Sequence, residues 1–223
     1  MNKQVLLQCL TLHKVLRSEM GPTAWKMPSA SDCIRYAAQE AAEVCDAEMR
    51  AKRNHARNNE RDGDLEAVAR ECADVIIMAH SALMQMDWEP SSHPAPFDDE
   101  VKEYFAWSRR ELQKDNDEVL WSDYLITSAG SALENFFIGN DEEDSYLYPA
   151  KDFSKVLLLG AIVHAMVVME STGHNPLTQV YKKCVDFATK HGERYREGYG
   201  LAVVDKLTEY YDAYMKIQSE WGN

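Results

Sequence analysis

Apolar residues recur at helical spacing along almost the whole of this chain. Val68, Cys72, Val75 and Ala79, for example, lie three or four positions apart. No convincing run of alternating β-branched residues bounded by turns interrupts the pattern, and residues that favour helices are plentiful. The sequence therefore predicts an all-α helical bundle. The expected helices span 2–18, 30–57, 65–87, 98–113, 118–138, 151–171, 176–192 and 201–219.

Polar residues suited to capping stand at several of the expected helix starts. Ser29 or Ser31 precedes the second segment, and Asp64 precedes the third. Asn175, followed by Pro176, precedes the seventh. A side-chain oxygen at such a position accepts a hydrogen bond from a first-turn N–H, and proline in the first turn forfeits no helical hydrogen bond.

The largest break in the pattern is the proline- and serine-rich stretch from Pro90 to Pro96. Such stretches interrupt helices and separate structural halves. We therefore expect one helical half over residues 1–90 and a second half over 91–223 that completes the bundle, together forming one compact domain.

Charge and cysteine content narrow the class of protein. A net charge of −13 over 223 residues argues against nucleic-acid binding, which needs basic patches. The first residues are too polar for a signal peptide, and no uninterrupted apolar run reaches ~18 residues, so we expect no membrane span. Five cysteines without zinc-ligand spacing are typical of thiols in a reduced compartment, so we expect a cytoplasmic protein.

A weak internal similarity links the two halves. Residues 79–86 resemble residues 163–170, and Ser131–Glu134 could correspond to Glu40–Glu43. The second half would then be a degenerate repeat that has lost most of its carboxylates. Chance similarity between helical segments is the alternative.

Two acidic motifs lie within expected helices. Glu40 and Glu43 occupy one, while Glu71 and Asp74 occupy the next. Residues three apart share a helix face, so two antiparallel helices would bring four carboxylates together. The alternative is that these carboxylates lie on a solvated helix face and have no function. Both pairs border small apolar residues, however, where an uncompensated charge is costly. Hard oxygen donors without nitrogen or sulfur select Mg²⁺, with Mn²⁺ as an alternative.

A di-iron bundle is a further class that carries carboxylates on helices, and its motifs need a histidine three residues after a glutamate. Asp46 follows Glu43 at that distance, and Ile77 follows Asp74. Neither position supplies an imidazole, so iron–oxygen chemistry is disfavoured.

The pattern Glu40-x-x-Glu43, 27 intervening residues, then Glu71-x-x-Asp74 resembles the all-α NTP pyrophosphohydrolases, the superfamily of MazG-like proteins, dimeric dUTPases and dCTP pyrophosphatases. The resemblance covers about residues 23–87. It implies a helical hydrolase that uses Mg²⁺ to cleave (d)NTP into (d)NMP and pyrophosphate, and it makes these four residues metal ligands. It also implies dimers or tetramers, so a homodimer is possible, although an internal repeat could complete the bundle within one chain.

The resemblance also suggests roles for individual residues. Gln39 stands where the family often has a further glutamate, so Glu43 or Asp46 is left to orient the attacking water. A C-terminal phosphate-binding segment would correspond to Lys190 and Arg194, with His191 and Gly192 departing from the family pattern.

Two further residues are candidates for contacting the nucleotide. Arg57 belongs to a basic cluster after the first motif, where a solvated surface charge is the alternative. Trp25 could stack on the base, or it could simply close the end of the bundle.

Two other functional classes remain open at the level of sequence. One is a non-catalytic helical relative that binds nucleotides or a protein partner. The other is a plain structural bundle whose carboxylates lie on its surface. Mg²⁺-dependent turnover of a nucleotide would separate the enzyme from both.

Overall fold

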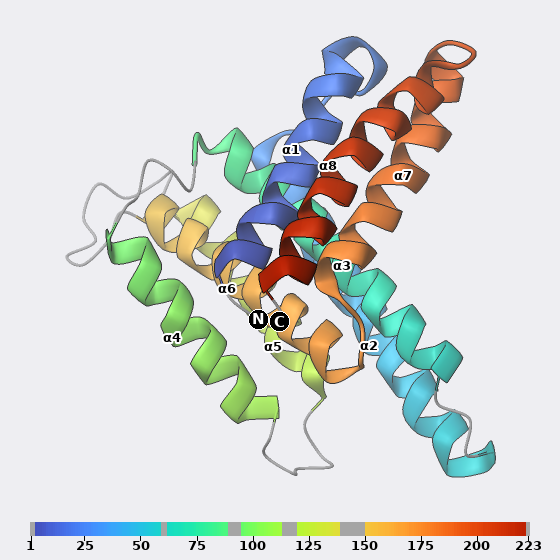
Figure 1. Cartoon of the computed structure of the whole chain (residues 1–223). Helices are drawn as coiled ribbons and strands as arrows, with labels where there is room; N and C mark the ends of the chain where they lie inside the picture. Colours follow the sequence, from blue (N-terminus) through green and yellow to red (C-terminus); the bar gives the residue numbers. More distant parts are fainter. Residues whose placement is uncertain (1–2, 59–61, 89–94, 113–119, 139–149, 222–223) are drawn as a thin grey trace. The chain divides into compact units, whose positions relative to one another are not determined.

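The computed structural model describes residues 3–58, 62–88, 95–112, 120–138 and 150–221. All the regular structure in these ranges is helical, which confirms the all-α prediction (Figure 1). The helices are α1 (Lys3–Ala24), α2 (Ala30–Asn58), α3 (Asp62–Gln85), α4 (Ala95–Leu112), α5 (Trp121–Ile138), α6 (Ala150–Ser171), α7 (Pro176–Tyr195) and α8 (Tyr199–Trp221).

The helices fall into two compact units. Unit 1 comprises Pro28–His174, and unit 2 combines Asn2–Met27 with Asn175–Asn223. This division differs from the expected boundary near residue 90, because α4 packs on α6 within unit 1 and α1 packs with α7 and α8 within unit 2. The proline-rich stretch that suggested the boundary lies mostly outside the described residues.

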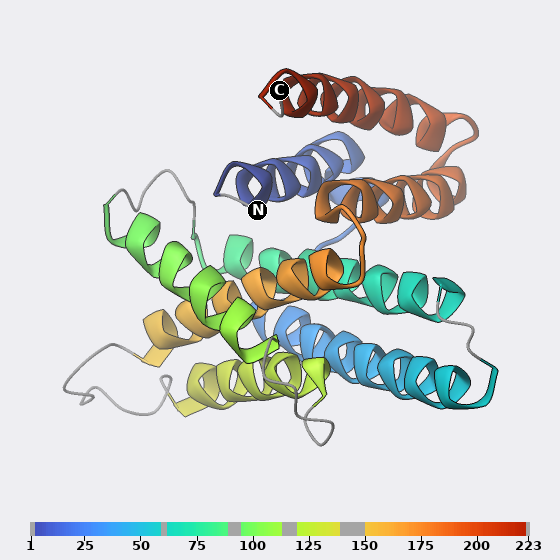
Figure 2. The same ribbon diagram turned by 60° about the horizontal axis from the view of Figure 1, so that its bottom comes forward.

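Unit 1 is built on four helices that pack as two pairs. Helices α2 and α3 run antiparallel side by side, and so do α5 and α6 (Figures 1 and 2). Helix α2 also contacts α5, and α3 contacts α6, which closes the bundle. The interior is apolar and includes the fully buried Ala41, Val44, Ile76, Leu125 and Ile162. Burying each of the larger side chains contributes about 1.5–3 kcal/mol.

Helix α6 is strongly apolar. The window Asp152–Ser171 is long and apolar enough to cross a membrane by length and composition, although 72% of it is buried inside the structure. The expectation of no such segment rested on uninterrupted apolar runs, whereas α6 is apolar on average although single polar residues interrupt it. Burial to this extent is equally typical of a helix at the centre of a core.

Unit 2 is a three-helix unit of α1, α7 and α8. Its last two helices approach closely at two glycines. A Cβ atom placed on Gly192 would lie 2.4 Å from the Cα atom of Gly200, so no larger residue fits there without a backbone shift. Tyr181 and Tyr211 stack farther along the same pair, with ring centroids 4.1 Å apart.

The helix starts follow the capping predictions in two cases out of three. The Oγ atom of Ser29 accepts from the backbone N–H of Asp32, and the Asn175 side chain accepts from that of Thr178. The prediction for Asp64 was wrong because α3 begins two residues earlier. The Asp64 carboxylate instead accepts a hydrogen bond from the Asn54 amide of α2 at 2.8 Å.

Candidate metal centre

Three of the four carboxylates predicted to bind metal converge in unit 1. Glu40 and Glu43 extend from α2, and Glu71 extends from α3. One oxygen atom from each lies within 4.8 Å of one from each of the others. The three residues are called the acidic cluster below. The antiparallel packing of α2 and α3 brings them together, as the sequence predicted.

The acidic cluster spans the edge of the bundle, from buried to exposed. Glu71 is buried, Glu40 is half-buried and Glu43 is exposed. The Arg70 guanidinium donates to Oε1 of Glu71 through two nitrogens, at 2.9 and 3.2 Å. The Gln39 amide donates to Oε1 of Glu43 at 3.3 Å. Three negative charges are therefore held close together at a surface that ions from solvent can reach.

Asp74, the fourth predicted ligand, lies one turn after Glu71 and is half-buried. It is not part of the acidic cluster, so its role as a ligand stays a prediction. Its charge lies near the thiol of Cys72. Burial raises the pKa of Cys72, and the charges of Glu48, Glu71 and Asp74 raise it further, so this thiol is neutral.

Asp46, the alternative water-orienting residue, is exposed on α2 and lies outside the acidic cluster. Three residues along a helix correspond to a rotation of about 300°, so Asp46 is turned a further ~60° from Glu43, away from Glu40. The Gln39 amide donates a hydrogen bond to Glu43 and so helps to hold its carboxylate in place.

The predicted nucleotide-contacting residues lie elsewhere in the chain. The side chain of Arg57 falls outside the described residues. Lys190 and Arg194 are exposed near the end of α7 in unit 2. Burial lowers the pKa of the neighbouring His191, and the charges of Arg194 and Lys190 lower it further, so the two cations form one local basic patch. Their proposed contact with phosphate stays a prediction.

Trp25 lies within a packed aromatic group of unit 2. The Arg17 guanidinium stands 3.6 Å from the centre of its ring, and the Phe187 ring centroid is 3.8 Å from its own. This environment fits the alternative stated for Trp25, that of a residue closing the end of a helical unit. Its role in base binding stays a prediction.

One buried, hydrogen-bonded carboxylate of unit 1 is a residue that the sequence analysis did not single out. Glu48 of α2 is 3% exposed. It accepts hydrogen bonds from the backbone N–H of Trp121 and from both the N–H and the hydroxyl of Ser122, at 2.9–3.0 Å. It therefore caps the N-terminus of α5, where unpaired N–H groups and the helix dipole favour an anion. The sequence signal that could have identified Glu48 is its position four residues after Val44, on the apolar face of α2.

His164 of α6 binds the same helix start from the other side. Its Nε2 lies 3.0 Å from the Trp121 carbonyl oxygen. Because a carbonyl oxygen only accepts, this nitrogen is protonated and donates a hydrogen bond to it. Burial lowers the pKa of His164 from 6.5 to about 4, against opposing effects of the hydrogen bond to Trp121 and the charge of Glu111. Glu48, Trp121, Ser122 and His164 are called the α5 junction below.

Comparison with known proteins finds no family model that matches this chain, and neither the curated proteins nor the solved structures give a match.

Proposed function

We propose that this protein is a Mg²⁺-dependent nucleoside triphosphate pyrophosphohydrolase, MazG-like in the broad sense, that converts (d)NTP to (d)NMP and pyrophosphate. The observation that carries the proposal is the acidic cluster, in which oxygens from two neighbouring helices lie within 4.8 Å of one another. The proposal also rests on the resemblance of the two acidic motifs to those of the all-α pyrophosphohydrolases.

The donor set of the acidic cluster fits Mg²⁺ or Mn²⁺. It consists of carboxylates, the hard oxygen ligands these ions prefer, and it contains no imidazole or thiolate that would favour zinc or iron. A divalent cation held there would neutralise phosphate oxygens and lower the pKa of a water molecule.

The protein's own groups divide the remaining work. Arg70 holds Glu71 in place from the same helix. Gln39 occupies Oε1 of Glu43, which leaves Oε2 of this exposed carboxylate to accept a proton from the attacking water. Because Asp46 is turned away from the cluster, we assign the water-orienting role to Glu43. Positioning and charge neutralisation supply most of the rate in reactions of this type.

A nucleotide panel tests the proposal directly. Purified protein is incubated with each canonical dNTP and NTP plus Mg²⁺, and the products are separated by anion-exchange chromatography. We expect monophosphate and pyrophosphate from at least one substrate, and a loss of roughly 100-fold or more in kcat for Glu43→Gln. Asp46→Asn should retain most of the activity, as should Glu134→Gln, which removes an exposed glutamate from α5.

A binding measurement beside the hydrolysis assay separates catalysis from the non-catalytic alternative. Isothermal titration with a non-hydrolysable triphosphate measures Mg²⁺-dependent binding independently of turnover. Binding without turnover of any nucleotide would make the protein a nucleotide-binding relative. Absence of both would reduce the acidic cluster to a surface feature and end the proposal.

A further inference from the structure

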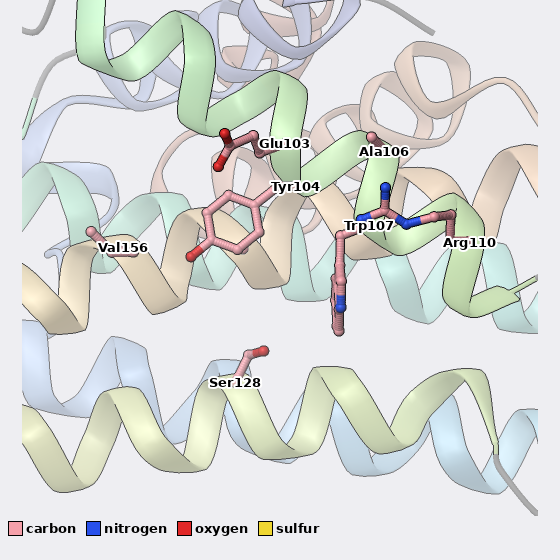
Figure 3. Close-up of a pocket in the computed structure, with 8 residues that line it drawn as sticks. Glu103, Tyr104, Ala106, Trp107, Arg110, Ser128 and Val156 are labelled. Carbon is pink, nitrogen blue, oxygen red and sulfur yellow. The ribbon is translucent and has the colours of Figure 1, made fainter.

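A second candidate site lies on unit 1, where α4 crosses α5 and α6. A cavity of about 710 Å³ opens there. Helix α4 contributes Glu103, Tyr104, Trp107 and Arg110 to its lining, α5 contributes Ser128, and α6 contributes Gly160 (Figure 3). This volume lies within the usual range of small-molecule sites, about 300–1,000 Å³.

The polar groups of the cavity are arranged along one direction. Glu103 and Arg110 are seven residues apart on α4, which corresponds to about two turns or ~10 Å along the same helix face. Both side chains are exposed, and neither forms an ion pair with another residue in the described part of the chain. The cavity therefore has an acceptor at one end and a cation at the other.

Aromatic rings occupy the space between these two charges. Trp107 extends from α4 toward α5, the Tyr104 ring lies over α6 beside Gly160, and Ser128 of α5 lies on the opposite side of the cavity (Figure 3). Such rings provide flat apolar surface, and the hydroxyl provides a polar contact. A planar molecule can lie against one of these rings while its ends reach Glu103 and Arg110.

Neighbouring groups hold the rings of Tyr104 and Trp107, which form the aromatic wall of the cavity, in place. Trp107 meets Tyr124 edge-on with ring centroids 4.9 Å apart, and the Tyr124 hydroxyl donates to Glu111 at 2.8 Å. Tyr104 lies over Gly160, where an added Cβ atom would be only 3.1 Å from its ring. Because few rearrangements are open to these rings, a ligand meets a wall that is already formed.

We propose that this cavity binds a small planar aromatic molecule with an anionic group near Arg110 and an N–H donor near Glu103. A nucleoside monophosphate and a nitrogen-containing aromatic carboxylate share this chemistry. Since Arg110 supplies the positive charge, binding needs no divalent cation. The inference is thus independent of the proposed hydrolase activity.

Fluorine NMR of protein labelled with 5-fluorotryptophan tests this proposal, with EDTA present throughout. Trp107→Phe identifies the resonance of Trp107. The probes are AMP and indole-3-acetate, together with naphthalene-1-acetate, which lacks the N–H group, and ribose 5-phosphate, which lacks an aromatic ring. We expect AMP, indole-3-acetate or both to shift the Trp107 resonance in a saturable way, and ribose 5-phosphate to leave it unchanged.

Variants at the two ends sharpen the test. Arg110→Gln should weaken binding of the active probes roughly tenfold or more, whereas Arg109→Gln, next to it but outside the cavity lining, should not. Glu103→Gln should weaken the binding of indole-3-acetate and leave the binding of naphthalene-1-acetate unchanged. A response to AMP alone identifies the ligand class as nucleotides, and a response to indole-3-acetate identifies it as aromatic carboxylates.

Two results would overturn the inference. One is the absence of any shift at Trp107 with all probes at millimolar concentration. The other is a shift that persists unchanged in both Arg110→Gln and Glu103→Gln. Glu71→Gln should retain probe binding even if it abolishes nucleotide hydrolysis, so failure of one proposal does not imply failure of the other.

Discussion

Helix α2 contributes carboxylates to both the acidic cluster and the α5 junction, and the two places differ in what surrounds the negative charge. At the junction, two backbone N–H groups and one hydroxyl surround the single buried charge of Glu48. In the acidic cluster, three carboxylates converge, and the hydrogen bonds described for them come from Arg70 and Gln39.

The difference shows how a buried or crowded carboxylate becomes tolerable. Glu48 is satisfied by groups that the fold itself supplies, so its role is to hold α5 against α2. Glu40, Glu43 and Glu71 instead bring three carboxylates together at the edge of the bundle, where a divalent cation from solution can bind to all of them. Stability should therefore respond to mutation with opposite signs at the two places.

The largest effect should follow from removing the Glu48 carboxylate. Glu48→Ala leaves the half-buried Trp121 N–H and the buried Ser122 N–H without their acceptor, and we expect it to lower the unfolding free energy by about 3–5 kcal/mol. Urea denaturation measures this change. Glu134→Ala, at an exposed site on α5, should change it by less than about 0.5 kcal/mol. Equal, small effects of the two substitutions would contradict the capping role.

The next effect is the pH dependence that His164 gives to the same junction. Above pH 6.5 this side chain is neutral in both the folded and the unfolded state, so its contribution to stability is fully present. Between pH 6.5 and about 4 only the unfolded state takes up the proton, and the unfolding free energy falls by about 3 kcal/mol in total.

His164→Gln removes this titration and can still donate to the Trp121 carbonyl. Unfolding curves at several pH values should therefore be flatter for this variant between pH 6.5 and 4. Parallel curves for the variant and the unmodified protein would show that His164 does not titrate as its burial implies.

A smaller effect should appear when Mg²⁺ is added. Binding to the folded state at 100 times the dissociation constant raises the unfolding free energy by about 2.7 kcal/mol, with a corresponding rise in Tm. Calorimetry with and without Mg²⁺ measures the rise. Glu71→Gln should abolish it, while Glu48→Gln, if folded, should retain it. A rise that survives Glu71→Gln would place the ion elsewhere.

The smallest effect is the relief of repulsion without metal. In EDTA, Glu43→Gln removes one of three close negative charges at an exposed position, so we expect a gain in stability of roughly 0.5 kcal/mol at low salt. The gain should shrink as ionic strength rises, because salt screens exposed charges. A loss of stability would indicate that the cluster is held by contacts other than those described.

The sequence predicted much of the secondary structure and part of the site. Helix α3, expected over 65–87, spans Asp62–Gln85, and the Asn175 cap was placed correctly. The convergence of Glu40, Glu43 and Glu71 followed from their spacing and from the short connection between two helices. These features depend on residues close together in the chain, where helix geometry fixes which side chains share a face.

Long-range features could not be predicted in this way. No sequence pattern near Glu48 predicts that its hydrogen-bond partners lie more than seventy residues later, at Trp121 and Ser122. The association of α1 with α7 and α8 likewise joins the two ends of the chain.

The sequence by itself determined that this chain is helical, where most helices begin and end, and that two acidic pairs face one way on successive helices. Only the tertiary structure decided which carboxylate is enclosed by hydrogen-bond donors, which three meet one another, and where α4 leaves a cavity. The physical reason is that helix formation and the direction of each side chain follow from local periodicity. Which helix faces meet depends on how the whole apolar surface can be buried at once.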